Sequence, residues 1–83
     1  MKVVSLRHVK LAERKGWALD VIWSMAIVYI WSDEHRAYWR PCGHGYSEYV
    51  DKAGEWPFEA AVDQTRHCGP EKKIIFKLAR RHA

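Results

Sequence analysis

The chain of 83 residues has no long apolar segment. Its most apolar run, from Trp17 to Trp31, contains Asp20 and is shorter than the about 20 apolar residues that a membrane span requires. Residues 1–15 carry repeated charges, where a secretory leader would need an uninterrupted apolar core. We therefore predict a cytoplasmic protein that has no membrane partner.

Cysteine is scarce, with two residues in the chain. In the cytosol a stable disulfide between Cys42 and Cys68 is not expected. These cysteines, together with His44 and His67, are the set of side chains that could form a zinc site. Their spacing fits poorly, because adjacent residues on a helix point about 100° apart and do not easily reach one ion. We expect no metal and no other cofactor, with Cys42 a free loop thiol and Cys68 a small buried residue.

The sequence also lacks a catalytic pattern. A domain of this length is too small to hold both a deep substrate cleft and a rigid scaffold around it. No glycine-rich phosphate loop is present, and the pairs Cys42 with His44 and Asp33 with Glu34 have no third, orienting group nearby in the sequence. We predict that the protein is not an enzyme and that it has no catalytic residue.

No internal repeat, linker or low-complexity tract divides the sequence, so residues 1–83 are expected to form a single domain. Tryptophan, by contrast, is abundant, with five residues that can each bury about 150–250 Å². They exceed what so small a core needs, so some are candidates for surface contact anchors. Exposed aromatic side chains can also serve self-association, and the expected state is a monomer or a homodimer.

The first quarter of the sequence has a mixed hydrophobic pattern. Val4 and Leu6 alternate with polar neighbours as in a short strand, whereas Leu11 and later apolar residues fall near one face of a helix. Gly16 would weaken a continuous helix by about 1 kcal/mol relative to Ala. We therefore predict a short strand at the start of the chain and a helix over Trp17–Met25.

β-Branched and aromatic residues next predict a hairpin formed by Ala26–Ile30 and Ala37–Trp39. On its second strand a tryptophan-rich face is expected to pack inward, while Tyr38 and Arg40 face outward. Pro41 ends the strand because it has no N–H group to donate.

A second helix and a final strand are predicted after residue 56. Pro57 suits the first turn of the helix, and Gly69 with Pro70 supplies its stop signal. The apolar stripe of this helix consists of Phe58, Ala61, Val62 and Thr65. A strand over Ile74–Leu78 then pairs with the hairpin. The expected fold class is α+β, a small single domain in which a short antiparallel β-sheet carries one or two packed helices.

The stretch from Tyr38 to Trp56 has no secondary-structure period and is crowded with aromatic residues and glycines. A long irregular loop in so short a domain is usually where function lies. Gly45 and Gly54 are expected to adopt positive φ and to fold the loop back over the hairpin. The loop residues expected to remain exposed, and so to contact a partner, are Arg40, Tyr49 and Lys52.

Short motifs mark the same region: Tyr38-Trp39-Arg40-Pro41, Gly45-Tyr46-Ser47, Ala53-Gly54 and Glu59-Ala60. Together they resemble a family of small proteins common in bacteriophages and prophages, although Ser47 stands where that family usually has Thr. The resemblance covers about half of the chain. It implies a protein that acts in the cytosol of a host cell and binds and inhibits or modulates a host protein or protein complex. A CRISPR-type defence complex is the most specific target that it suggests.

Basic side chains are concentrated towards the two ends of a chain whose net charge is +4. Such a surface attracts nucleic acid, anionic membranes or an acidic protein face, and it can also be a solvated tail. The late residues expected to bind a partner are Lys72, Lys73, Arg80 and Arg81. The alternative function is therefore that of a small nucleic-acid-binding accessory protein, with phosphate contacts beside exposed aromatic rings. No helix-turn-helix, zinc-finger or aromatic RNA-binding signature is present.

Overall fold

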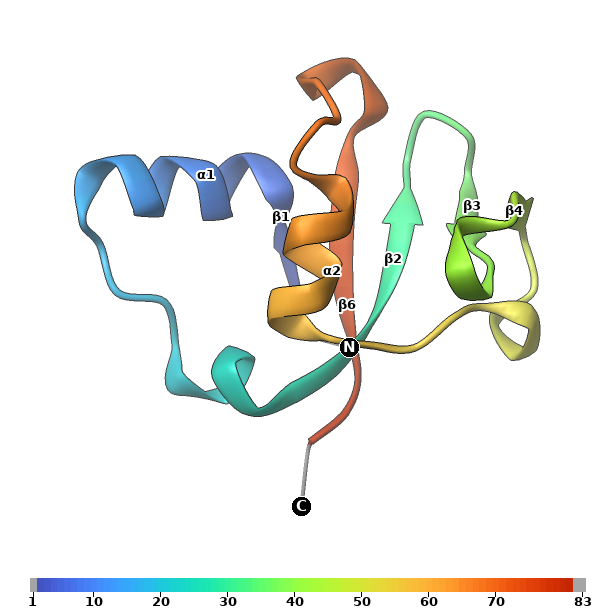
Figure 1. Ribbon diagram of the computed structural model, residues 1–83, viewed down its shortest axis with the longest axis horizontal. Helices are drawn as coiled ribbons and strands as arrows, with labels where there is room; N and C mark the ends of the chain where they lie inside the picture. The colour runs from blue at the N-terminus through green and yellow to red at the C-terminus, as the bar shows by residue number, and fades with distance from the viewer. Residues whose placement is uncertain (1, 82–83) are drawn as a thin grey trace.

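The computed structural model describes residues 2–81, and at residues 43 and 81 it describes only the backbone. Two α-helices pack on a six-stranded antiparallel sheet (Figure 1). The strands are β1 (Val3–Ser5), β2 (Ala26–Ser32), β3 (Ala37–Trp39), β4 (Tyr46–Ser47), β5 (Trp56–Pro57) and β6 (Ile74–Arg81). The helices are α1 (Leu6–Lys15) and α2 (Phe58–Thr65), and the 3₁₀ helices are η1 (Val21–Met25), η2 (Pro41–Gly43), η3 (Val50–Lys52) and η4 (Pro70–Lys72). The strand order is β1-β6-β2-β3-β4, with β5 also paired to β2. The predicted α+β class is confirmed.

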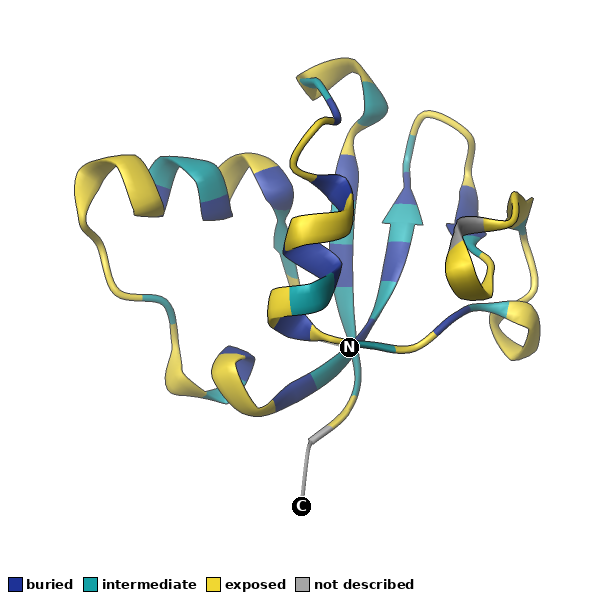
Figure 2. Ribbon diagram, viewed as in Figure 1, coloured by how far each residue is buried: buried dark blue, intermediate teal, exposed yellow. Residues whose placement is uncertain are grey.

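One face of the sheet, here called the inner face, holds the core. Along β2 buried and half-buried residues alternate, so Val28 and Ile30 point to the inner face beside Phe76 of β6 (Figure 2). Both helices pack on these residues, α1 through Val9 and α2 through Ala61 and their neighbours. Burying an aliphatic or aromatic side chain of this size contributes about 1.5–3 kcal/mol. The opposite, outer face is covered by neither helix.

The first helix lies earlier than predicted, and the expected helix over Trp17–Met25 is wrong. The side chain of Ser5 caps α1 by accepting a hydrogen bond from the His8 backbone N–H at 3.0 Å. Gly16 ends it in the left-handed conformation at φ 73°. The glycine therefore terminates a helix instead of weakening one. Only η1 forms in the predicted range, while the short strand at the start of the chain is confirmed as β1.

The hairpin of β2 and β3 is confirmed, and Tyr38 lies on the outer face, opposite Trp39, as predicted, although its ring is covered there. The register pairs Tyr38 with Trp31, which places both rings on the outer face with centroids 4.8 Å apart. Tyr38 is only 9% exposed because Trp31 and Tyr29 pack against it. Trp39 points to the inner face and contacts the core, and Arg40 is exposed as predicted.

The second half of the chain follows the predicted order. In α2 the whole predicted stripe is buried, although Pro57 precedes the helix instead of lying in its first turn. The final strand is confirmed and extends to Arg81. Within residues 2–81, neither helix has the length and apolarity that crossing a membrane requires.

Of the glycines expected to have positive φ, Gly45 does at 92°, but Gly54 does not. Gly54 is needed for space, because an added Cβ would lie 2.5 Å from the Trp56 ring and 3.0 Å from the Pro41 Cα. Its N–H donates to the Trp39 carbonyl at 2.9 Å, which ties the irregular segment to β3. The absent side chain therefore allows this segment to close against the sheet.

We expect Gly54→Ala to lower the free energy of unfolding by about 1–3 kcal/mol, because the methyl group overpacks the Trp56 ring. Phenylalanine has a smaller ring, so Gly54→Ala should lower the free energy of unfolding less when it is combined with Trp56→Phe. Urea unfolding of the single and double variants measures this difference. Gly16→Ala is the control, since its cost comes from backbone strain at a site with no heavy atom within 4 Å. If Gly54→Ala lowered the free energy of unfolding equally in the wild-type protein and in the Trp56→Phe variant, the steric explanation would be contradicted.

Candidate functional site

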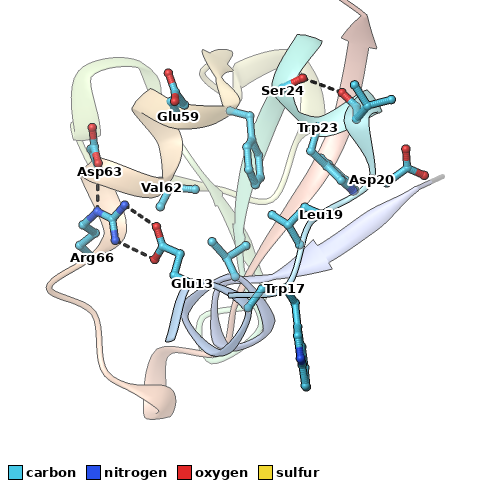
Figure 3. Close-up of a pocket in the computed structure, with 14 residues that line it drawn as sticks. Glu13, Trp17, Leu19, Asp20, Trp23, Ser24, Glu59, Val62, Asp63 and Arg66 are labelled. Atoms are coloured by element: carbon cyan, nitrogen blue, oxygen red, sulfur yellow. Dashed lines mark hydrogen bonds and ion pairs between the residues drawn. The ribbon is translucent and has the colours of Figure 1, made fainter. Parts of the chain in front are cut away.

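A groove runs between α1, the segment from residue 17 to residue 24 and α2, with a volume of about 600 Å³ (Figure 3). Its floor is apolar and includes Val9, Trp23, Phe58 and Val62, and the rings of Trp23 and Phe58 pack with centroids 5.4 Å apart. Its rim carries four carboxylates, those of Glu13, Asp20, Glu59 and Asp63, together with Arg66. We call this feature the acidic groove.

The ion pairs of the rim close one end of the acidic groove. Arg66 donates two hydrogen bonds to the Glu13 carboxylate, at 3.0 and 2.9 Å, and a third to Asp63 at 3.0 Å. The two bonds to Glu13 join α1 to the end of α2 across 53 positions of sequence. The hydrogen bonds from Arg66 lower the pKa of Glu13 more than its slight desolvation raises it, and they raise the pKa of Arg66.

The remaining rim keeps negative charge in a protein whose net charge is +4. Asp20 pairs with Lys2 at 2.9 Å, which neutralises the far end of the groove only partly because both groups are half exposed. Within the described residues Glu59 has no ion-pair partner. The acidic groove is therefore a local reversal of the overall charge.

Exposed apolar side chains stand at the mouth of the acidic groove. Trp17 is 54% exposed and Val21 is 73% exposed, and both line the groove. In Figure 3 the Trp17 ring extends away from the floor, while Leu19 and Trp23 point inward. Trp17 thus fits the expectation that some tryptophans lie at the surface. Apolar side chains at the edge of an apolar floor are typical of protein-binding surfaces.

The predicted contact residues of the irregular segment are exposed, as expected for Arg40, Tyr49 and Lys52. None of them lines the acidic groove. They lie between β3 and β5, at the opposite end of the strand order from α1. Their role in binding stays a prediction.

The predicted basic residues near the end of the chain do not form one cluster. Lys72 and Lys73 precede β6 and Arg80 lies near its end, so at about 3.3 Å per residue they are roughly 20 Å apart. Lys72 pairs with Glu34 at 3.4 Å, and Arg80 pairs with Glu55 at 3.2 Å. The backbone of Arg81 belongs to β6, but its side chain lies outside the described part.

The proposed alternative zinc ligands are also not brought together. Among residues 2–81, no three His, Cys, Asp or Glu side chains are arranged to hold a metal ion. Cys42 is an exposed free thiol and Cys68 is buried, as predicted. His67 Nε2 lies 3.8 Å from the Cys68 sulfur, and burial raises the pKa of that thiol.

Comparisons of the chain with protein-family models, curated proteins and solved structures found no match. The acidic groove was not predictable from the sequence, because its rim combines residues from α1, from the segment before η1 and from α2 with its C-terminal cap, which no sequence motif links.

The Glu13–Arg66 ion pair predicts a specific dependence of stability on pH. Its hydrogen bonds lower the pKa of folded Glu13 below the ordinary value of 4.5, so the pair stabilises the fold above that value. This contribution is lost as the pH falls through the lowered pKa. Glu13→Gln should therefore reduce the free energy of unfolding at about pH 7, and the difference should shrink towards about pH 3.

Urea unfolding at both pH values measures this difference. Glu59→Gln is the matched control, because Glu59 lies on the same rim without an ion-pair partner in the described structure. Its effect should be small and similar at both pH values. A Glu13→Gln effect that is as large in acid as at neutral pH would contradict the role of the carboxylate charge.

Proposed function

We propose that the protein binds a partner protein through the acidic groove, which docks a segment carrying an apolar anchor beside Lys or Arg. The observation that carries this proposal is the combination of an apolar floor with exposed Trp17 and Val21 at its mouth. Isolated exposed apolar residues are ordinary, but a contiguous set around a concave apolar floor marks an interaction site.

Charge selects the kind of segment. The rim residues Glu13, Asp20, Glu59 and Asp63 outnumber Arg66, so a basic segment is attracted and an acidic one is repelled. Glu59 offers a carboxylate that needs no prior ion pair to break. A volume of about 600 Å³ admits a few side chains, so the partner would insert part of a helix or loop while the rest of its surface stays outside.

The resemblance to phage proteins supports a host protein as the partner and inhibition or modulation as the outcome. Defence complexes of the CRISPR type hold nucleic acid in positively charged channels. A segment rich in Lys and Arg on such a complex would complement the acidic groove, and its occupation would obstruct the channel. This proposed role is one of binding and requires no catalytic residue.

Site-specific photo-crosslinking tests the proposal. A photoreactive amino acid in place of Val21 should crosslink to one discrete protein in nuclease-treated bacterial lysate, and mass spectrometry should place the crosslink in a basic segment. The same amino acid at Val50 is the matched control, because this valine is also exposed, at 47%, but lies in η3.

The expected result is a crosslink from position 21 and none from position 50. Glu59→Lys should reduce the yield at position 21, while Gln64→Lys on the exposed surface of α2 should leave it unchanged. A discrete partner that crosslinks from position 50 only would assign binding to the irregular segment. That outcome would overturn the proposed role of the acidic groove.

A further inference from the structure

A second groove lies on the other flank of α1, bounded by η4 and the start of β6, and has a volume of about 750 Å³. Three of its basic residues, Arg7, Lys10 and Arg14, recur at helical spacing along one side of α1. Lys73 faces them, and Asp33 is the only carboxylate among the described residues of the lining. We call this feature the basic groove.

Two of these four cations, Arg7 and Arg14, are free to meet a ligand. Lys10 donates to the Cys68 carbonyl at 3.0 Å, which anchors α1 to the segment after α2. Arg7 and Arg14 are exposed and have no ion-pair partner among the residues that the structure describes. The Glu71 carboxylate also lies beside Gly69 of the lining. Four cations still outnumber the two carboxylates, and two of the cations are unpaired guanidinium groups, which favours a polyanion.

The basic groove continues onto the outer face of the sheet. Ser5 and Ile75 both line it and are paired in register, and Ile75 is in turn paired with Trp31. Trp31 also donates from its indole N–H to Asp33 of the groove at 3.2 Å. The ammonium group of Lys77 lies 4.0 Å from the Trp31 ring centroid. Aromatic and cationic side chains therefore adjoin the basic groove on a face that neither helix covers.

We propose that the basic groove and the adjoining Trp31 bind single-stranded nucleic acid. Phosphates would lie along Arg7, Arg14 and Lys73, and an unpaired base would stack on Trp31. Stacking would displace the Lys77 ammonium from the ring, and this cation would then meet a neighbouring phosphate. A duplex hides the faces of its bases, so only a single strand can use both parts of the surface.

This site is separate from the acidic groove, so the inference goes beyond the proposed function and stands without it. Most of its cations also differ from the residues near the end of the chain that the sequence predicted to bind a partner. Of that set only Lys73 lines the basic groove, whereas the stripe on α1 supplies the rest.

Fluorescence anisotropy with a labelled oligothymidine of about 12 nucleotides tests the inference, because single-strand sites span about 4–16 nucleotides. We expect the single strand to bind more tightly than the duplex it forms with oligoadenine and more tightly than polyaspartate. If three phosphates are contacted, affinity should fall about 20-fold between about 50 and about 200 mM salt. Equal or tighter binding of the duplex or of polyaspartate would overturn the proposal, as would no binding at the lower salt concentration.

Matched variants separate the site from general charge. Arg14→Gln and Gln64→Glu change the net charge equally, but only Arg14 lines the basic groove. Arg14→Gln should weaken binding and reduce the salt slope by about 0.7, whereas Gln64→Glu should change neither. Equal effects of the two variants would overturn the assignment of the phosphate contacts.

The stacking contact has its own test. Trp31→Leu should weaken binding by about 5- to 150-fold, and Trp31→Tyr, which keeps a ring, should retain most of the affinity. Circular dichroism spectra and melting curves would verify that each variant folds. Folded Trp31→Leu with unchanged affinity would overturn the proposed role of the ring.

Discussion

The antiparallel pairing of β2 with β6 is the interaction on which the rest of the structure depends. Each strand fully buries a residue at the centre of the inner face, Ile30 from β2 and Phe76 from β6, and these two are register partners. Every other strand but β4 attaches to one member of this pair, and both helices cover it. Because about half of the chain separates the two strands, their pairing closes a long loop at an entropic cost. The apolar side chains of α1, η1 and α2 offset that cost by completing the core.

Because α1 covers the central pair of strands from one side, it lies between the acidic groove and the basic groove. Its buried stripe fixes the rotation of the helix, so Glu13 faces α2 while Arg7 and Arg14 face η4 and the edge of β6. The two grooves are thus consequences of how one amphipathic helix packs. A protein with a basic-segment site on one flank and a nucleic-acid site on the other could engage a complex that contains both, which is the composition of the proposed defence target.

Much of the fold could be predicted from local patterns. β-Branched and aromatic residues located β2, alternation of apolar residues located β6, and the stripe from Phe58 to Thr65 located α2. The first helix was missed although Ser5, the basic last turn and Gly16 were start and stop signals, because the apolar residues after Gly16 suggested a competing helix. The role of Gly54 was misjudged because it depends on where the Trp56 ring lies. Neither groove was predictable, since Glu13 meets Arg66 and Asp33 meets Lys73 only through the tertiary fold.

If both proposals hold, the two flanks of α1 bind ligands of opposite charge. Amide NMR spectra recorded during separate titrations with oligothymidine and with a short peptide of alternating Leu and Lys would test it most directly. We expect the oligonucleotide to shift the signals of Arg7, Lys10 and Ile75, and the peptide to shift those of Trp17, Val21 and Glu59. Shifts of the same residues by both ligands, or shifts confined to the irregular segment between β3 and β5, would contradict it.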